Sequence, residues 1–338
     1  MSDPQTPQAN PIYEVLIRTL ARRKVSDFHL HAGEKAKIRE SGDLQALDFA
    51  ITNEMLEDFL RTELGEEGYA AFAASGDVDF AVEYKGQRFR ANGYKMAHGL
   101  AMVLRVILTE VPHIDSLGLP PAVHDVLTEK AGLVLVTGQT GSGKSTSLAA
   151  MVDKINRERG ENIITIEDPI EFVHKNKNSI ITQREVGRDT NSFATALKGA
   201  LRQDPDIILL GELRDYETVS MALTAAETGH LVFGTLHTSG APETINRIID
   251  VFPAEEQAQA RSQLSQSLRL VMTQQLLKRQ GGGRIGAFEV MVCVPAVANL
   301  IRESKIVQIQ TVMQTGKQFG MVTMDKYIEL LHEKNLVE

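Results

Sequence analysis

Residues 138 to 146, GQTGSGKST, are the segment of this sequence whose residue types and spacing point most directly to a chemistry. The glycines, lysine and serine match the pattern G-x-x-x-x-G-K-[ST], which binds nucleotide phosphates. Small residues in such a loop let backbone N–H groups turn toward phosphate oxygens. We therefore expect a nucleotide-binding loop made of Gly138, Gln139, Thr140, Gly141, Ser142, Gly143, Lys144, Ser145 and Thr146.

Two side chains of this loop have a predicted role in chemistry. Lys144 would reach the β and γ phosphates as a mobile cation, and Ser145 would place its hydroxyl on Mg²⁺. The pattern therefore predicts ATP and Mg²⁺ as the cofactors.

The segments on either side of the loop agree with this interpretation. The preceding run, 132 to 138, is continuously apolar, as is typical of a buried parallel strand. Apolar residues recur at helical spacing after the loop, so a helix whose positive N-terminal end faces the phosphates should follow. These residues are Leu148, Met151, Val152 and Ile155.

Acidic residues stand at the ends of two further strand-like runs. Glu167 and Asp168 end the apolar run of IITIEDPIEF, and Glu212 follows the run of DIILLGELRD. Hydrolysis needs a carboxylate that orients or deprotonates water and others that steady hydrated Mg²⁺. We assign the first role to Glu212, and a share in water or Mg²⁺ positioning to Glu167. A single acidic residue after a strand is more often a helix cap or a solvated charge, but two beside a phosphate loop favour a site.

Two histidines, His230 and His237, bracket a third apolar run, GHLVFGTLHT. A histidine at the exit of a strand can hydrogen-bond a γ-phosphate oxygen and report its loss to the chain. Taken alone, either histidine is more typical of a structural hydrogen bond.

Composition limits the class of protein. A length of 338 residues suggests about two domains, and the single cysteine, Cys293, lies in an apolar run typical of a core. Neither a signal peptide nor a membrane-spanning segment is expected, and a reducing cytoplasm is the expected compartment. The net charge of −8 disfavours nucleic acid as a partner.

The order of the segments predicts two domains with different folds. Residues 1–10 are expected to form a disordered tail and 109–123 a linker. Residues 11–108 are expected to form a smaller α+β domain with one helix near its start, a helical stretch around NEMLEDFLRTEL and five strand-like pieces. Residues 124–338 alternate strands with helices, which predicts an α/β domain with a largely parallel sheet. Its last part, from about 285 to 338, is expected to be helical. The nucleotide should bind at the C-terminal edge of the strands.

Three longer segments carry a resemblance to a known family. ITIEDPIEF, GELRDYETVSMALTAAETGHLVFGTLHT and IDVFPAEEQ are similar to the Asp box, Walker B segment and His box of secretion-type ATPases. The chain most closely resembles the type IV pilus retraction motors, the PilT family, from VSDFHLHAG to GMVTMDKY. The resemblance implies a hexameric motor that hydrolyses ATP to drive pilus retraction and twitching motility. Each subunit would have a PAS-like N-terminal domain and a RecA-like core.

The resemblance also implies roles for particular residues. Glu167 falls on the Asp-box glutamate, Glu212 on the Walker B glutamate, and His230 and His237 on the His-box positions. The family has glycine where many phosphate-loop enzymes have aspartate, and Gly211 agrees with this.

Without that aspartate, Ser145 would be the main protein ligand of Mg²⁺. Arg90 and Arg105 match two arginines of the N-terminal domain that touch the γ-phosphate region in the family, where a guanidinium neutralises transition-state charge.

The chain departs from the family in two places. Retraction motors usually carry AIRNLIRE near the C-terminus, whereas this chain reads AVANLIRE over 296–303, with Ala298 in place of arginine. The early loop HAGEKAKIRE also lacks the prolines common there. An auxiliary retraction paralogue therefore stays open beside the main motor. So does a pilus or secretion-system assembly ATPase, although those typically have a longer N-terminal region and a four-cysteine zinc module.

The implied partners are further copies of the chain, an inner-membrane platform protein at the pilus base, and a paralogous retraction ATPase. The implied location is the cytoplasm, peripheral to the inner membrane. Two alternatives from other classes are a nucleotide-binding accessory with little turnover of its own and a nucleic-acid translocase. The set Lys144, Glu167, Glu212 and His230 disfavours the first, and the acidic balance disfavours the second.

Overall fold

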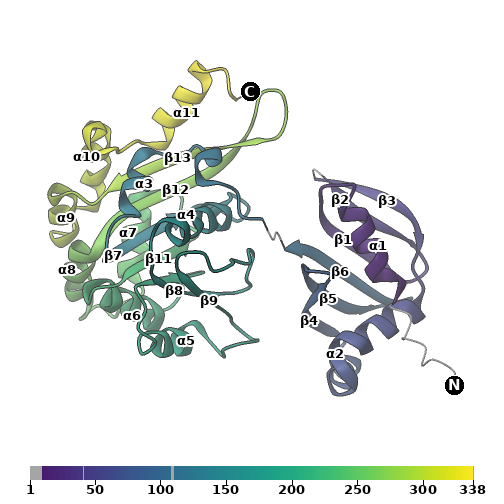
Figure 1. Ribbon diagram of the computed structural model, residues 1–338. Coiled ribbons are helices and arrows are strands. Elements are labelled where there is room, and N and C mark those ends of the chain that lie inside the picture. Colours follow the sequence, from purple (N-terminus) through teal and green to yellow (C-terminus); the bar gives the residue numbers. More distant parts are fainter. Residues whose placement is uncertain (1–9, 41, 108–109, 338) are drawn as a thin grey trace. The chain divides into compact units, whose positions relative to one another are not determined.

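The computed structural model describes residues 10–40, 42–107 and 110–337 (Figure 1). The chain divides into two compact units, 1–109 and 110–338. The predicted disordered tail lies outside the described residues except for Asn10. Asn10 is buried, and its side chain accepts a hydrogen bond from the backbone N–H of Ile12 at the start of the first helix.

The first unit is built on a six-stranded antiparallel sheet in the order β3-β2-β1-β6-β5-β4. Helices α1 (Pro11–Leu20) and α2 (Asn53–Ser75) contribute apolar side chains to the core of this unit. The strands are β1 (Val25–His31), β2 (Lys35–Glu40), β3 (Asp43–Ala50), β4 (Asp77–Tyr84), β5 (Gln87–Met96) and β6 (Gly99–Ile107). Strand β3 was not expected: most of its side chains are exposed, and the alternation of the half-buried Leu47 and Phe49 with exposed neighbours is short.

The second unit contains a seven-stranded sheet in the order β13-β12-β7-β11-β10-β8-β9. All neighbours are parallel except β12 and β13, which confirms the predicted α/β fold. The strands are β7 (Gly132–Thr137), β8 (Asn162–Glu167), β9 (Ile180–Glu185), β10 (Ile207–Leu210), β11 (Leu231–Leu236), β12 (Leu268–Lys278) and β13 (Arg284–Val292).

Helices cover both faces of this sheet, as Figure 1 shows. One face packs against α3 (Pro121–Val126) and α4 (Lys144–Glu158). The other packs against α5 (Phe193–Ala200), α6 (Tyr216–Glu227), α7 (Ala241–Asp250), α8 (Gln257–Ser267), α9 (Pro295–Arg302) and α10 (Ile309–Thr315). The last helix, α11 (Met324–Glu333), packs on β13. Central strands buried on both faces explain the continuous apolar runs in the sequence.

Two predicted boundaries of the second unit need correction. The expected linker, 109–123, contributes buried side chains such as Ile114, Leu119 and Val123 to the core of this unit. The expected helical part, 285–338, begins instead with strand β13, and its first helix starts at Pro295. Strand β12 lies beside β7 and supplies the neighbour that makes β13 a strand.

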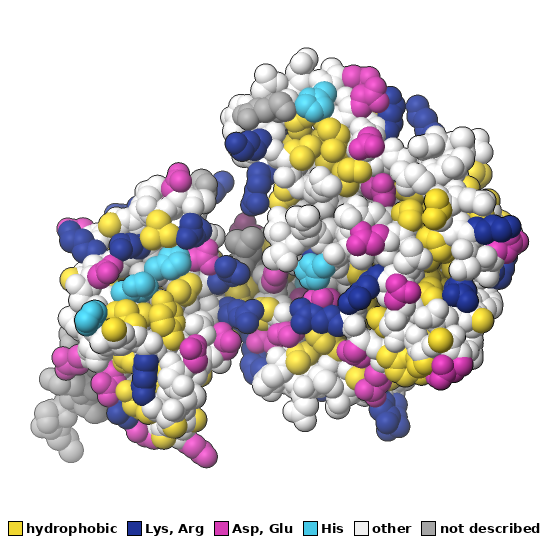
Figure 2. All heavy atoms as spheres, turned by 180° about the vertical axis from the view of Figure 1, so that it is seen from behind, with side chains coloured by type: hydrophobic (Ala, Val, Ile, Leu, Met, Phe, Trp, Pro, Cys, Tyr) yellow, Lys and Arg dark blue, Asp and Glu magenta, His cyan; other side chains and the backbone are white. Residues whose placement is uncertain are grey.

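The surface of the molecule carries charges of both signs (Figure 2). Lys and Arg side chains are interspersed with Asp and Glu side chains on the face shown in Figure 2. None of the helices within the described ranges has the length and apolar character of a membrane span. Cys293 packs against the core, and burial raises the pKa of its thiol to about 11.

Candidate active site

The phosphate loop connects β7 to α4 at the C-terminal edge of the parallel sheet. Every residue of β7 is buried, and Gly143 is the N-cap residue of α4. The first backbone N–H groups of a helix have no partner within the helix and form a natural anion site. The structure thus confirms the predicted strand, loop and helix around 138–146.

Lys144 is bonded to its own loop in this structure. Its Nζ donates to the carbonyl oxygens of Gly138 at 2.7 Å and Gln139 at 3.1 Å. Nζ also lies 3.5 Å from Nδ1 of His237. Burial lowers the pKa of Lys144, while the charges of Glu212 and Glu171 oppose that shift. A phosphate would give this partly buried ammonium group an anionic partner in place of neutral carbonyls.

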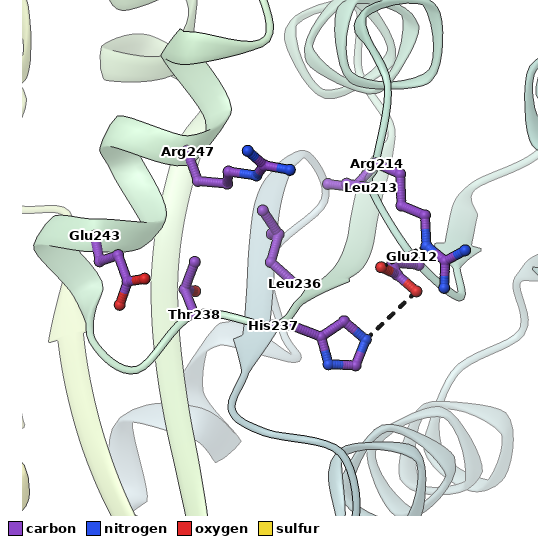
Figure 3. Close-up of a pocket in the computed structure, with 8 residues that line it drawn as sticks. All are labelled: Glu212, Leu213, Arg214, Leu236, His237, Thr238, Glu243 and Arg247. Carbon is purple, nitrogen blue, oxygen red and sulfur yellow. Dashed lines mark ion pairs between the residues drawn. The ribbon is translucent and has the colours of Figure 1, made fainter.

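A hollow beside the loop contains Glu212, the residue after Gly211 at the exit of β10 (Figure 3). Glu212 Oε1 lies 2.6 Å from Arg214 Nε, and Oε2 lies 3.4 Å from His237 Nε2. Burial acts to raise the pKa of Glu212, but these two neighbours outweigh it and the pKa is lowered. The hollow is lined by Glu212, Leu213, Arg214, Leu236, His237, Thr238, Glu243 and Arg247.

Glu167 ends the neighbouring strand β8 in a different environment. Its Oε1 accepts hydrogen bonds from Thr165 Oγ1 at 2.6 Å and Gln183 Nε2 at 3.1 Å. Burial raises the pKa of Glu167, although both bonds act to lower it. The two carboxylates at this edge therefore differ in pKa, and two carboxylates set apart in this way can take different roles in hydrolysis.

Gly211 allows the two acidic strand ends to approach each other. Its N–H donates to the carbonyl oxygen of Ile166 at 2.8 Å. A Cβ at this position would lie 3.2 Å from Glu167 Cα, which is tighter than most real contacts. Glycine, rather than aspartate, therefore suits the close approach of β10 to the end of β8.

His230 and His237 lie at opposite edges of the sheet. The register pairs Leu231 with Gly132 and Leu236 with Thr137, so His230 precedes β11 at the edge away from the loop. Nδ1 of His230 is 2.9 Å from the carbonyl oxygen of Ala225. The structure brings His237 to the phosphate loop and does not bring His230 there, because a parallel strand starts and ends at opposite edges.

Arg90 and Arg105 belong to the first unit, where they are direct neighbours on β5 and β6. Arg105 in turn lies opposite Asp27 on β1, and its Nε is 2.8 Å from Asp27 Oδ1. Directly opposite residues of antiparallel strands point to the same face. Both guanidinium groups therefore lie on one face of this sheet, and their predicted contact with nucleotide stays a prediction.

Two residues near the site were not predicted from the sequence. Arg214 has a weak sequence signal, since it is a cation two residues after a strand-end glutamate. Gln274 has none, because β12 is distant from the loop in the chain and pairs with β7 only in the fold.

A family model for type II/IV secretion system proteins matches residues 73–329 of the chain. The chain belongs to this family. Among the relatives in this secretion family, the type IV pilus retraction ATPase PilT of Pseudomonas aeruginosa is 47% identical over 324 residues, covering 95% of this chain and 94% of the relative. The type IV pilus ATPase PilU of the same organism is 37% identical over 323 residues, covering 95% and 85%.

A solved structure is similar to this chain as well. A crystal structure of the pilus retraction motor PilT with bound ADP aligns with a TM-score of 0.90 and 44% sequence identity. The alignment covers 97% of this chain and 94% of that one. The likeness extends over both units.

Proposed function

We propose that this protein hydrolyses ATP and uses the energy to drive retraction of type IV pili. The observation that carries the proposal is its 47% identity, along 95% of the chain, to a retraction ATPase. The geometry is consistent with this activity, because the phosphate loop, Lys144, His237 and Glu212 meet at one edge of the sheet.

In this function Glu212 orients and deprotonates the attacking water, since its lowered pKa keeps it ionised. Lys144 neutralises charge on the phosphates. Oxygen ligands suit Mg²⁺, and the Ser145 hydroxyl, with Glu167 acting through water, would hold it. Mg²⁺ would neutralise charge on the phosphate oxygens.

Retraction further requires an assembly that converts hydrolysis into movement. We propose a homo-hexameric ring, peripheral to the inner membrane, that acts on a platform protein at the pilus base. Arg90 and Arg105 would complete the nucleotide site across a domain or subunit boundary. A role of His230 in turnover requires the same kind of boundary, because it lies at the opposite edge of the sheet from the loop. Native mass spectrometry tests the ring, and a strictly monomeric protein with full activity would contradict it.

An auxiliary retraction ATPase is the second candidate, supported by Ala298 in place of the usual arginine of the retraction signature. Identity to PilT is higher than to PilU, at 47% against 37% over similar lengths, which favours the main motor.

Deletion of the gene in its host separates these candidates. A main retraction motor predicts cells that keep or accumulate surface pili and lose twitching. Complementation with Glu212→Gln should fail to restore twitching, whereas the wild-type gene should restore it. Bald cells would instead indicate an assembly motor, and piliated cells that still twitch would indicate an auxiliary role.

A further inference from the structure

One buried polar residue outside all of the nucleotide motifs contacts both ends of the phosphate loop. Gln274 lies within β12 and its exposed fraction is 4%. Strand β12 runs parallel to β7, and the register pairs Thr273 with Thr137, whose hydroxyl oxygens are 2.9 Å apart. The residues after this pair are Gln274, still within β12, and Gly138, just after the end of β7, so Gln274 lies beside the first glycine of the loop.

The two outer glycines of the loop lie too close to Gln274 to carry side chains. Gly138 has φ +136°, and a Cβ there would overlap the backbone carbonyl oxygen of Gln274. Gly143 has φ +91°, and a Cβ there would lie 2.7 Å from Gln274 Nε2. L-residues rarely adopt these backbone conformations. The main chain of Gln274 therefore supports the start of the loop, and its side chain supports the end.

A single hydrogen bond orients the amide of Gln274. Ser147 Oγ, in the first turns of α4, donates to Gln274 Oε1 at 2.8 Å, and both residues are buried. The NH₂ group consequently faces Gly143. Within the described part of the chain it has no hydrogen-bond acceptor. A primary amide carries two donors, so this side of the loop presents neutral N–H groups.

We propose that Gln274 is a positioning residue for nucleotide binding. It holds the phosphate loop against β12 and presents neutral N–H groups to the loop, where a carboxylate would place a negative charge. The proposal rests on the proposed function, because it assumes that the loop binds the phosphates of ATP or ADP. Glutamine suits this position on two grounds: Oε1 fixes the amide to α4, and the N–H side is compatible with an anion nearby. A carboxylate of the same shape would still accept the hydrogen bond from Ser147, but it would present a negative charge to the loop in place of N–H groups.

The chain offers a matched pair of variants for the test. Gln274→Glu changes an amide to a carboxylate beside the loop. Gln275→Glu makes the same change on the next residue, which is exposed and points to the opposite face of the sheet. ADP affinity of the purified protein, measured by fluorescence of a labelled nucleotide, should fall by roughly tenfold or more for Gln274→Glu. Gln275→Glu should bind ADP as the wild type does.

The pH dependence tests whether the negative charge causes the loss of affinity. A protonated carboxyl regains a donor and loses its charge, so the affinity deficit of Gln274→Glu should shrink as the pH is lowered. Protonation would also relieve misfolding caused by a buried charge, so thermal unfolding without nucleotide is followed at each pH to show that the variant is folded at the assay temperature. Equal deficits in both glutamate variants, or a deficit in Gln274→Glu that does not change with pH, would overturn the proposal.

Two neutral variants test the proposal even where a buried carboxylate prevents folding. Gln274→Met keeps the approximate size and removes both polar groups, and Ser147→Ala removes the bond that orients the amide. Each should weaken ADP binding several-fold while the protein stays folded at the assay temperature, which thermal unfolding without nucleotide checks. Wild-type affinity in both would refute the role of Gln274. Loss of affinity together with an intact pilus phenotype would support the role of Gln274 in nucleotide binding and count against the proposed motor function.

Discussion

The imidazole Nε2 of His237 lies 3.4 Å from the Oε2 oxygen of Glu212. Its other ring nitrogen, Nδ1, lies 3.5 Å from Nζ of Lys144. One ring therefore bridges the group that would neutralise phosphate and the group that would activate water. A γ-phosphate that engages Lys144 must change this contact, so His237 is well placed to respond to hydrolysis.

Glu212→Gln should separate binding from turnover. Loss of a general base lowers kcat by roughly 10² to 10⁴-fold, whereas ATP affinity should be retained because the loop is unchanged. Phosphate release and nucleotide binding measure the two quantities. Glu243→Gln is the control, since Glu243 lines the same hollow and is bonded to Ser239 rather than to His237. Normal turnover in Glu212→Gln would reject the assignment.

Lys144→Ala should have the opposite signature. The variant loses a charge-assisted bond to phosphate, so nucleotide affinity should fall by roughly 10 to 100-fold. Titration with labelled ADP measures the change. Lys154→Ala, in the same helix and paired with Glu158, should bind ADP normally. Equal affinities in the two variants would contradict the role of Lys144.

Arg214→Gln should change the pH dependence of turnover. The folded-state pKa of Glu212 is lowered, and Arg214 is the larger of the two causes that lower it. Without this cation, burial dominates and the pKa rises, so the carboxylate becomes protonated at a higher pH. The acid limb of the kcat profile should therefore move to higher pH. Arg247→Gln lines the same hollow without bonding Glu212 and should leave the acid limb in place. An unshifted limb in Arg214→Gln would count against the ion pair.

Arg90→Ala and Arg105→Ala should both lower kcat, by roughly 10³-fold if each acts as an arginine finger. Their effects on stability should differ. Arg105→Ala removes the charged partner of Asp27, whose side chain is 8% exposed, and should cost about 1 kcal/mol of unfolding free energy. Arg90→Ala removes a like-charge neighbour and should cost almost none. Thermal unfolding and ATPase assays check both expectations. Full activity in both variants would exclude a role in turnover.

The sequence by itself determined the local parts of this protein. The apolar run before the loop and the helical spacing after it predicted β7 and α4, because short-range patterns reflect burial on both faces of a strand or one face of a helix. The same reasoning located Glu212 and Glu167 at strand ends. His237 directly follows the apolar run of β11, so the sequence alone placed it at the exit of that strand.

Tertiary structure alone decided which distant residues meet. The segment of β13 was expected to be helical, since its assignment as a strand depends on pairing with β12, which in turn pairs with β7. Gln274 lies under the loop for the same reason. His230 shows the converse case: a shared motif grouped it with His237, but the length of a parallel strand separates them. Pairing between distant segments is a non-local contact, and local patterns carry no record of which strands become neighbours.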